Sequence, residues 1–129
     1  MKSKIIHGCR LLFGLAFIVF GLNGFFGFIP MPAPPEAGGA YLGALGATGY
    51  FFPVLKICEI LAGIFILTNI FLNFGLVLIA PILVQIFLYH LFLDPAGLAL
   101  PIILVVMHLF LTYQNCASYK SLFSKSSSI

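Results

Sequence analysis

The sequence predicts an all-α fold, a membrane four-helix bundle with a short extra interfacial helix between the first and second spans. The observations behind it are the composition and the length of the apolar runs. Of 129 residues, 62% are hydrophobic and 7% are charged, whereas about a quarter of the residues in a soluble domain are charged. Six basic and three acidic side chains cannot cover a water-facing surface. Lipid must therefore be the solvent of most of the chain.

Four apolar runs are long enough to cross a hydrocarbon core, which takes about 20 helical residues. They are residues 5–29, 53–71, 74–93 and 98–119. The first run is longer than the apolar stretch of a cleaved signal peptide, so we interpret it as a span. We expect one transmembrane domain, residues 1–120, followed by a short polar cytoplasmic tail, residues 121–129.

Prolines and glycines mark the connections between the predicted helices. Residues 30–35 read PMPAPP, and proline cannot continue a helix because it lacks the amide donor. Residues 36–50 then predict a short helix, which begins at Pro35 and stops at Thr48-Gly49. This helix is too short to span, so we expect it at the membrane surface. Further along, Asp94 is expected to cap the N-terminus of the fourth span.

Glycines at three-residue spacing predict faces through which helices approach one another closely, since packing rather than water exclusion drives helix association in lipid. The two series are Gly21, Gly24 and Gly27 in the first span and Gly43, Gly46 and Gly49 in the surface helix. In the third span, Pro81 is expected to bend the helix and to free the carbonyl one turn earlier.

The basic residues predict the orientation of the chain. Five of the six fall at one end of the predicted spans, while the acidic residues Glu36 and Asp94 lie in the loops on the other side. The five are Lys2, Lys4, Arg10, Lys120 and Lys125. The positive-inside rule assigns that end to the cytoplasm. Both termini are then cytoplasmic, which requires an even number of spans.

Polar side chains at similar depth predict a site in the outer half of the bundle. At about 1.5 Å of rise per residue, three different spans each bring such side chains to within about 12 Å of their outer ends. These candidates for ligand or proton binding are Asn23, Lys56, Glu59, Gln85 and His90. Polar groups in lipid turn toward one another, so we expect a polar pocket that opens to the outer side.

Lys56 and Glu59 are three residues apart and therefore neighbours on one helical face. In a structural interpretation they form a self-neutralising pair that holds the bundle in register, with Asn23 and Gln85 completing its hydrogen bonds. In a functional interpretation Glu59, the deeper of the two, binds protons or a substrate. The sequence leaves both interpretations open.

Histidines and cysteines give no pattern typical of a metal or redox site. His90 and His108 lie at predicted depths of about 5 and 16 Å, too different to share an ion. We expect His108 to be a hydrogen-bonded residue of the interior. Cys9 and Cys116 could pair only if the first and last spans touch, and the reducing cytoplasmic side favours free thiols. No catalytic constellation is present in the sequence, so we predict no intrinsic enzyme activity and no metal.

Several segments resemble the DoxX-like family of small four-helix membrane proteins. They are residues 21–32 (GLNGFFGFIPMP), 43–53 (GALGATGYFFP), Glu59 with Leu-Ala-Gly at 61–63, and 90–97 (HLFLDPAG). The resemblance implies the four-helix fold and a location in the bacterial cytoplasmic (inner) membrane. It also implies a link to redox chemistry, because the family is named after a subunit associated with a quinone-linked thiosulfate-oxidising system.

The leading hypothesis is an accessory membrane subunit that binds a lipophilic ligand, such as a quinone, in the outer pocket beside a redox partner subunit. Glu59 and His90 would exchange protons, and Lys56 would keep Glu59 charged. Asn23 and Gln85 would orient the ligand. The alternatives are a small oligomeric transporter or channel and a purely structural assembly partner. The net charge of +3 lies mainly at the inner ends and predicts lipid contact rather than nucleic-acid binding.

Overall fold

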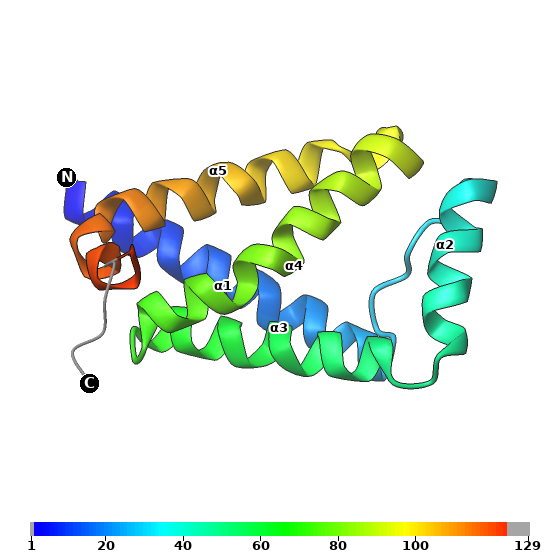
Figure 1. Ribbon diagram of the computed structural model, residues 1–129, viewed down its shortest axis with the longest axis horizontal. Helices are drawn as coiled ribbons and strands as arrows, with labels where there is room; N and C mark the ends of the chain where they lie inside the picture. Colours follow the sequence, from blue (N-terminus) through cyan, green and yellow to red (C-terminus); the bar gives the residue numbers. More distant parts are fainter. Residues whose placement is uncertain (1, 124–129) are drawn as a thin grey trace.

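The computed structural model describes residues 2–123, and this part of the chain is built of helices without a strand (Figure 1). The three predicted spans 5–29, 53–71 and 74–93 are confirmed as helices, and so is the short helix after the proline-rich loop. The elements are α1 (Lys2–Phe26), α2 (Glu36–Ala47), α3 (Phe51–Thr68), α4 (Leu72–Leu93) and α5 (Ala99–Gln114), with the 3-10 helices η1 (Pro95–Gly97) and η2 (Cys116–Phe123).

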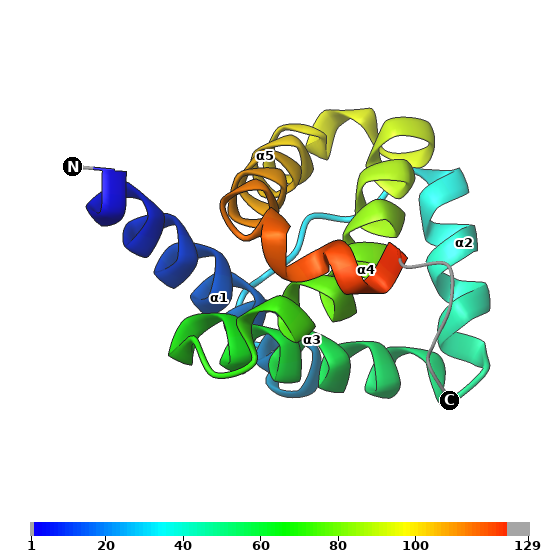
Figure 2. The ribbon, with the colours of Figure 1, turned by 60° about the vertical axis from the view of Figure 1, so that its left-hand side comes forward.

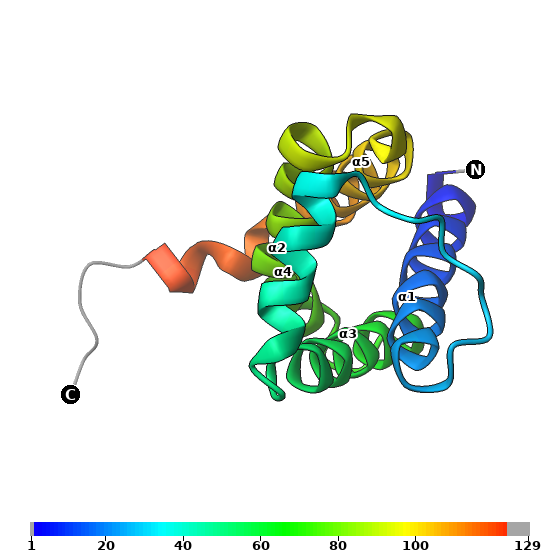
Figure 3. The same ribbon diagram turned by 90° about the vertical axis from the view of Figure 1, so that its right-hand side faces the viewer.

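The long helices pack side by side in a closed order. α1 lies along α3, α3 along α4 and α4 along α5, and α5 returns to contact α1 (Figure 3). At one end α2 crosses over and contacts α3 and α4, while the start of α1 and η2 lie at the opposite end (Figure 1). Polar groups near the end covered by α2 are therefore the ones that the sequence assigns to the outer half.

Length and composition show which helices could cross a membrane. α1, α3 and α4 are each long and apolar enough, and α5 qualifies only together with η2. Side chains on the outward faces are largely apolar and exposed, for example Leu12 (65%) and Phe92 (73%). A large exposed apolar surface of this kind is typical of a protein whose solvent is lipid. The helices are thus compatible with a multi-pass integral membrane protein.

The predicted fourth span, residues 98–119, is wrong in its extent. α5 ends at Gln114, and η2 leaves its axis at an angle of 82° (Figure 2). Asn115 carries the bend: its backbone is no longer helical (φ −116°, ψ 21°), and its side-chain amide donates to the Leu111 carbonyl at 2.8 Å. An amide side chain that bonds the local backbone offers an alternative to the helix ladder. Residues 121–123 belong to η2, and the rest of the predicted tail lies outside the described residues.

The predicted cap of the fourth span is also wrong. Asp94 makes no side-chain capping bond, and the turn of η1 intervenes before α5 begins at Ala99. The predicted end of the surface helix at Thr48-Gly49 is confirmed. α2 ends at Ala47, the Thr48 hydroxyl donates to the Leu45 carbonyl at 2.7 Å, and Gly49 adopts φ +81°. A positive φ is the backbone conformation that favours glycine, so Gly49 turns the chain into α3.

Glycine lets α1 and α3 touch backbone to backbone. A Cβ atom added at Gly63 would lie 2.8 Å from the Gly14 carbonyl oxygen, and one added at Gly14 would lie 2.7 Å from the Leu67 amide nitrogen. Gly21 approaches the Lys56 carbonyl in the same way, at 3.0 Å. Such close approach maximises dispersion contact where water exclusion cannot drive association. α1 and α3 are therefore held together by direct contact between their backbones.

The predicted glycine faces are confirmed in part. Gly21 and Gly24 both face α3. Gly27 does not, because it lies beyond the end of α1 with φ +60°, where its N–H donates to the Asn23 carbonyl at 2.8 Å. In the surface helix a Cβ atom at Gly46 would contact the Phe52 ring at 3.6 Å, but Gly43 and Gly49 have open space around them, so the series as a whole is not a packing face. Gly38 is the glycine of α2 that packs closely, against the Tyr89 hydroxyl.

Arg10 joins α1 to the C-terminal end of α3. Its guanidinium donates to the Ile66 carbonyl at 3.0 Å and to the Leu67 carbonyl. These carbonyls belong to the last turn of α3, where backbone acceptors lack helical partners and the helix dipole favours a cation. The sequence assigned Arg10 to topology alone, but the structure shows that the side chain also ties the two helices together.

Arg10→Met is expected to lower the free energy of unfolding by about 1.5 kcal/mol, because two partly buried carbonyls lose a charged donor. Thermal unfolding in dodecyl maltoside, followed by circular dichroism at the helix band, measures the loss. Lys4→Met is the matched control, since it removes the same charge from an exposed position on the same helix. Equal melting temperatures for the two variants would contradict the capping role of Arg10.

Candidate functional site

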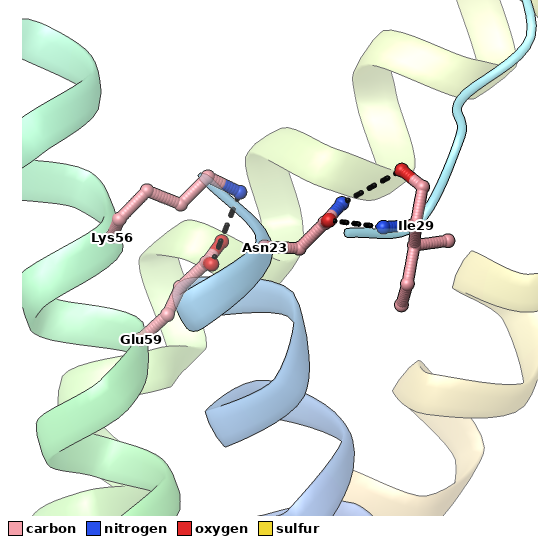
Figure 4. A network of polar contacts seen from close by, with 4 residues as sticks. All are labelled: Asn23, Ile29, Lys56 and Glu59. Carbon is pink, nitrogen blue, oxygen red and sulfur yellow. Dashed lines mark hydrogen bonds and ion pairs between the residues drawn. The ribbon is translucent and has the colours of Figure 1, made fainter. Parts of the chain in front are cut away.

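Lys56 and Glu59 form the predicted ion pair on α3. The Lys56 Nζ atom lies 3.2 Å from the Glu59 Oε2 atom (Figure 4). Glu59 is on the buried face of α3 with Ala62 and Ile66 and is only 2% exposed, whereas the Lys56 side chain is 24% exposed. A carboxylate so deeply buried is costly unless it is paired. Lys56 supplies that pairing and still reaches the surface.

Gly24 on α1 makes room for the pair. A Cβ atom at Gly24 would lie 2.5 Å from the Lys56 Cγ atom and 2.7 Å from its Cδ atom. The aliphatic stem of Lys56 therefore lies flat against the bare backbone of α1 and directs the ammonium group to Glu59. The ion pair is consequently part of the α1–α3 contact, which the spacing of the glycines alone did not indicate.

Asn23 points away from the ion pair. Its Oδ1 atom accepts a hydrogen bond from the Ile29 amide at 2.7 Å, and its Nδ2 atom donates to the Ile29 carbonyl at 3.4 Å (Figure 4). The side chain thus fastens the loop that leaves α1, as amide side chains commonly do in turns. The expectation that Asn23 completes the hydrogen bonds of Lys56 and Glu59 is wrong.

Gln85 lies in a different place, a hollow of about 240 Å³ between α2 and α4. Tyr41 of α2 and Tyr89 of α4 line this hollow, and their rings stack with centroids 5.9 Å apart and planes inclined by 29°. The remaining lining is apolar and comes from α4: Leu88, Phe92 and Leu93. No hydrogen bond joins Gln85 to the ion pair within residues 2–123, so the expectation that it completes the pair is wrong too.

Tyr41 and Tyr89 are not among the residues that the sequence predicts for the site. Tyr89 has its hydroxyl group beside Gly38, where a Cβ atom would lie 2.6 Å away. Gly38 therefore allows α2 to dock on α4, and the docking forms one side of the open hollow. A signal was available, because tyrosines are enriched at membrane interfaces, where one end of the ring is apolar and the other polar.

His90 supports the turn after α4. Its Nδ1 atom lies 2.9 Å from the Ile86 carbonyl oxygen, and its ring lies edge-on to the Tyr89 ring with centroids 5.0 Å apart. Gly97 in η1 packs against the other side, where a Cβ atom would lie 2.8 Å from the His90 Cδ2 atom. His90 therefore has no contact with the ion pair, and it lies behind Tyr89 without lining the Gln85 hollow itself.

The five predicted residues thus occupy four separate environments. Lys56 and Glu59 come together, while Asn23, Gln85 and His90 each have other neighbours. Their similar depth below the outer ends of the spans was predicted from the rise per residue of each helix alone. Whether they face each other depends on the rotation of each helix about its axis, which depth does not determine. The structure brings them to the same end of the helices and does not bring them into one pocket.

His108 is hydrogen-bonded, as predicted, but it is half-buried between α4 and α5 and does not lie in the interior of the bundle. Its Nε2 atom lies 2.8 Å from the Leu76 carbonyl oxygen, so that nitrogen carries the proton and donates from α5 to α4. Leu76 precedes Val77, whose carbonyl loses its helical donor because Pro81 has no N–H. The bond therefore joins the two helices beside the proline-containing turn of α4.

Cys9 and Cys116 are not placed to pair, although α1 and α5 do touch. The Cys9 thiol faces the Met107 carbonyl at 3.9 Å. Met107 lies within α5, whereas Cys116 lies beyond the end of α5, after the bend at Asn115, at the start of η2. All three cysteines are free thiols. Within residues 2–123 no three His, Cys, Asp or Glu side chains group as metal ligands would.

Comparison of the chain with family models, with curated proteins and with solved structures found no match. The resemblance to the DoxX-like family therefore rests on the sequence segments quoted above.

Proposed function

We propose that this chain is a multi-pass membrane protein of the DoxX-like type, an accessory subunit that binds a lipophilic, quinone-type ligand in the hollow beside Gln85. α5 serves as the fourth span, η2 continues from it at the level of the lipid head groups, and α2 lies on the outer surface of the membrane. The termini are cytoplasmic, in the bacterial inner membrane. The basic start of α1 and the basic η2 at one end of the helices support this orientation (Figure 1).

The lining of the hollow is the observation that carries the proposal. A quinone head group is flat and presents two carbonyl oxygens. The stacked rings of Tyr41 and Tyr89 offer an aromatic surface, and the Gln85 amide and the tyrosine hydroxyls can donate hydrogen bonds to carbonyl oxygens. A volume of about 240 Å³ suits a head group, and the tail would run along the apolar residues of α4 into the lipid.

The Lys56–Glu59 pair has a structural role in this proposal. Its closed geometry and its place on the α1–α3 contact favour that role over direct contact with the ligand. Of the five candidate residues, Gln85 is then the one that we assign to orienting the ligand. A redox partner subunit would supply or consume the bound quinone, and copurification from native membranes identifies such a partner.

Equilibrium binding of decylubiquinone to the purified protein in nanodiscs tests the proposed site. Gln85→Leu is expected to weaken binding about fivefold, which corresponds to the loss of one ordinary hydrogen bond. Tyr41→Leu is expected to weaken binding further, because it removes the stacking surface. Gln114→Leu, at the far end of α5, is the matched control. Unchanged affinity in both hollow variants, with wild-type melting temperatures, would exclude this site.

A further inference from the structure

A second site lies at the opposite end of the molecule, in a groove of about 780 Å³ between α4 and α5. The two helices converge near η1 and diverge toward the end where η2 lies (Figure 1). η2 crosses from the end of α5 to the start of α4, where the Tyr119 hydroxyl donates to the Asn73 carbonyl at 3.4 Å. Tyr119 is 9% exposed and anchors η2. The groove is thus walled by two helices and closed at one end by a third.

The accessible surface of the groove is almost entirely apolar, although His108, Thr112 and Tyr113 of α5 also line it. Val77 and Ala80 line it from α4, Leu109 from α5, and Leu122 and Phe123 from η2. Ala80 is small and lies one residue before Pro81, so α4 presents a shallow wall there. Leu109 and Phe123 are 61% and 84% exposed, which shows that the groove is open along its side. An apolar groove of this size that is open along its side is suited to a hydrocarbon chain.

A single cation marks one end of the groove. Lys120 lines it from η2 and is exposed, and η2 lies at the end that the positive-inside rule assigns to the cytoplasm. A lysine at this level attracts anionic head groups, and basic pockets between helices on the cytoplasmic side are typical sites for them. The apolar groove and the charge of Lys120 at its end together match a lipid with an acyl chain and a phosphate-bearing head group.

We propose that this groove binds one anionic phospholipid of the inner leaflet, with an acyl chain between α4 and α5 and its head group paired with Lys120. The lipid would fill the space where the two helices diverge. It would also explain why α5 bends at Asn115: η2 then lies at the level of the head groups, and Tyr119 holds it against α4. The site is separate from the hollow beside Gln85 and stands independently of it.

The chain contains no tryptophan, so a single introduced tryptophan reports on the lipid beside it. Leu109→Trp places the reporter in the groove, and Leu12→Trp, on the exposed face of α1 with similar exposure (65% against 61%), is its control. The protein is reconstituted in phosphatidylcholine vesicles that contain brominated phosphatidylglycerol or brominated phosphatidylcholine as quencher. We expect the groove reporter to prefer phosphatidylglycerol about fivefold over the control position.

Two further substitutions in the Leu109→Trp background test separately the charge of Lys120 and the shape of the groove. Lys120→Gln is expected to reduce the preference to that of the control position, whereas Lys4→Gln, which removes an equivalent charge from α1, leaves it unchanged. Ala80→Phe is expected to block the channel and to remove the preference while Lys120 remains. Equal quenching by both lipids at Leu109→Trp, or a preference that survives Lys120→Gln, would overturn the proposal. So would a cross-linked dimer that shields the reporter from both lipids, because the occupant would then be a second copy of the chain.

Discussion

Replacing Lys56 alone by methionine is expected to lower the free energy of unfolding by about 3–5 kcal/mol. The change leaves the Glu59 carboxylate, 2% exposed, without its partner at 3.2 Å. Within residues 2–123 Glu59 has no second hydrogen-bonding side chain that could take over. Unfolding by sodium dodecyl sulfate in dodecyl maltoside micelles, followed by circular dichroism, measures the loss.

Two companion variants show whether Lys56 and Glu59 act as one unit. Glu59→Gln alone is expected to cost less than Lys56→Met, because the partly exposed lysine can extend toward the surface. The double variant, Lys56→Met with Glu59→Leu, is expected to regain most of the stability, since it leaves no buried charge. If the two single losses simply add up in the double variant, the residues are not coupled and the structural role is wrong.

Gly63→Leu is expected to destabilise the α1–α3 pair by about 3 kcal/mol, because overpacking at a close contact forces the backbones apart. Even the first added carbon would meet the Gly14 carbonyl oxygen at 2.8 Å and the Ile18 amide nitrogen at 2.9 Å. Both are backbone atoms, which cannot move aside as a flexible side chain would. The same detergent titration measures the effect.

Gly8→Leu is the matched control for Gly63→Leu. Gly8 lies in α1, and an added Cβ atom there would have nothing within 4 Å. Leucine favours the helical conformation more than glycine does, so this variant is expected to be at least as stable as the wild type. Comparable losses in the two variants would contradict a backbone contact at Gly63.

Local features of the fold could be predicted from the sequence. The apolar runs and the prolines of the loop placed α1, α2, α3 and α4, because helix formation in an apolar chain depends on composition and on breakers close by. The Lys56–Glu59 pair was predictable for the same reason, since a spacing of three residues brings side chains together on any helix.

Contacts between helices could not be predicted in the same way. Asn23, Gln85 and His90 share a depth with the ion pair but not its neighbours, because each helix is rotated to bury its own packing face. Arg10 caps α3 by bonding Ile66 and Leu67, which follow it in the sequence by 56 and 57 positions. Nothing in the local pattern around Arg10 distinguishes that role from a topological charge.

The sequence by itself determined the class of the molecule, its helical segments and the ion pair, because these depend on composition and on the periodicity of single helices. Only the tertiary structure decided that α5 turns at Asn115 into η2, that Tyr41 and Tyr89 line a hollow together with Gln85, and that a groove ends at Lys120. These features arise where separate helices meet. Their geometry is set by contacts between residues far apart in the sequence, such as Gly38 with Tyr89 and Tyr119 with Asn73, which form only once the chain is folded.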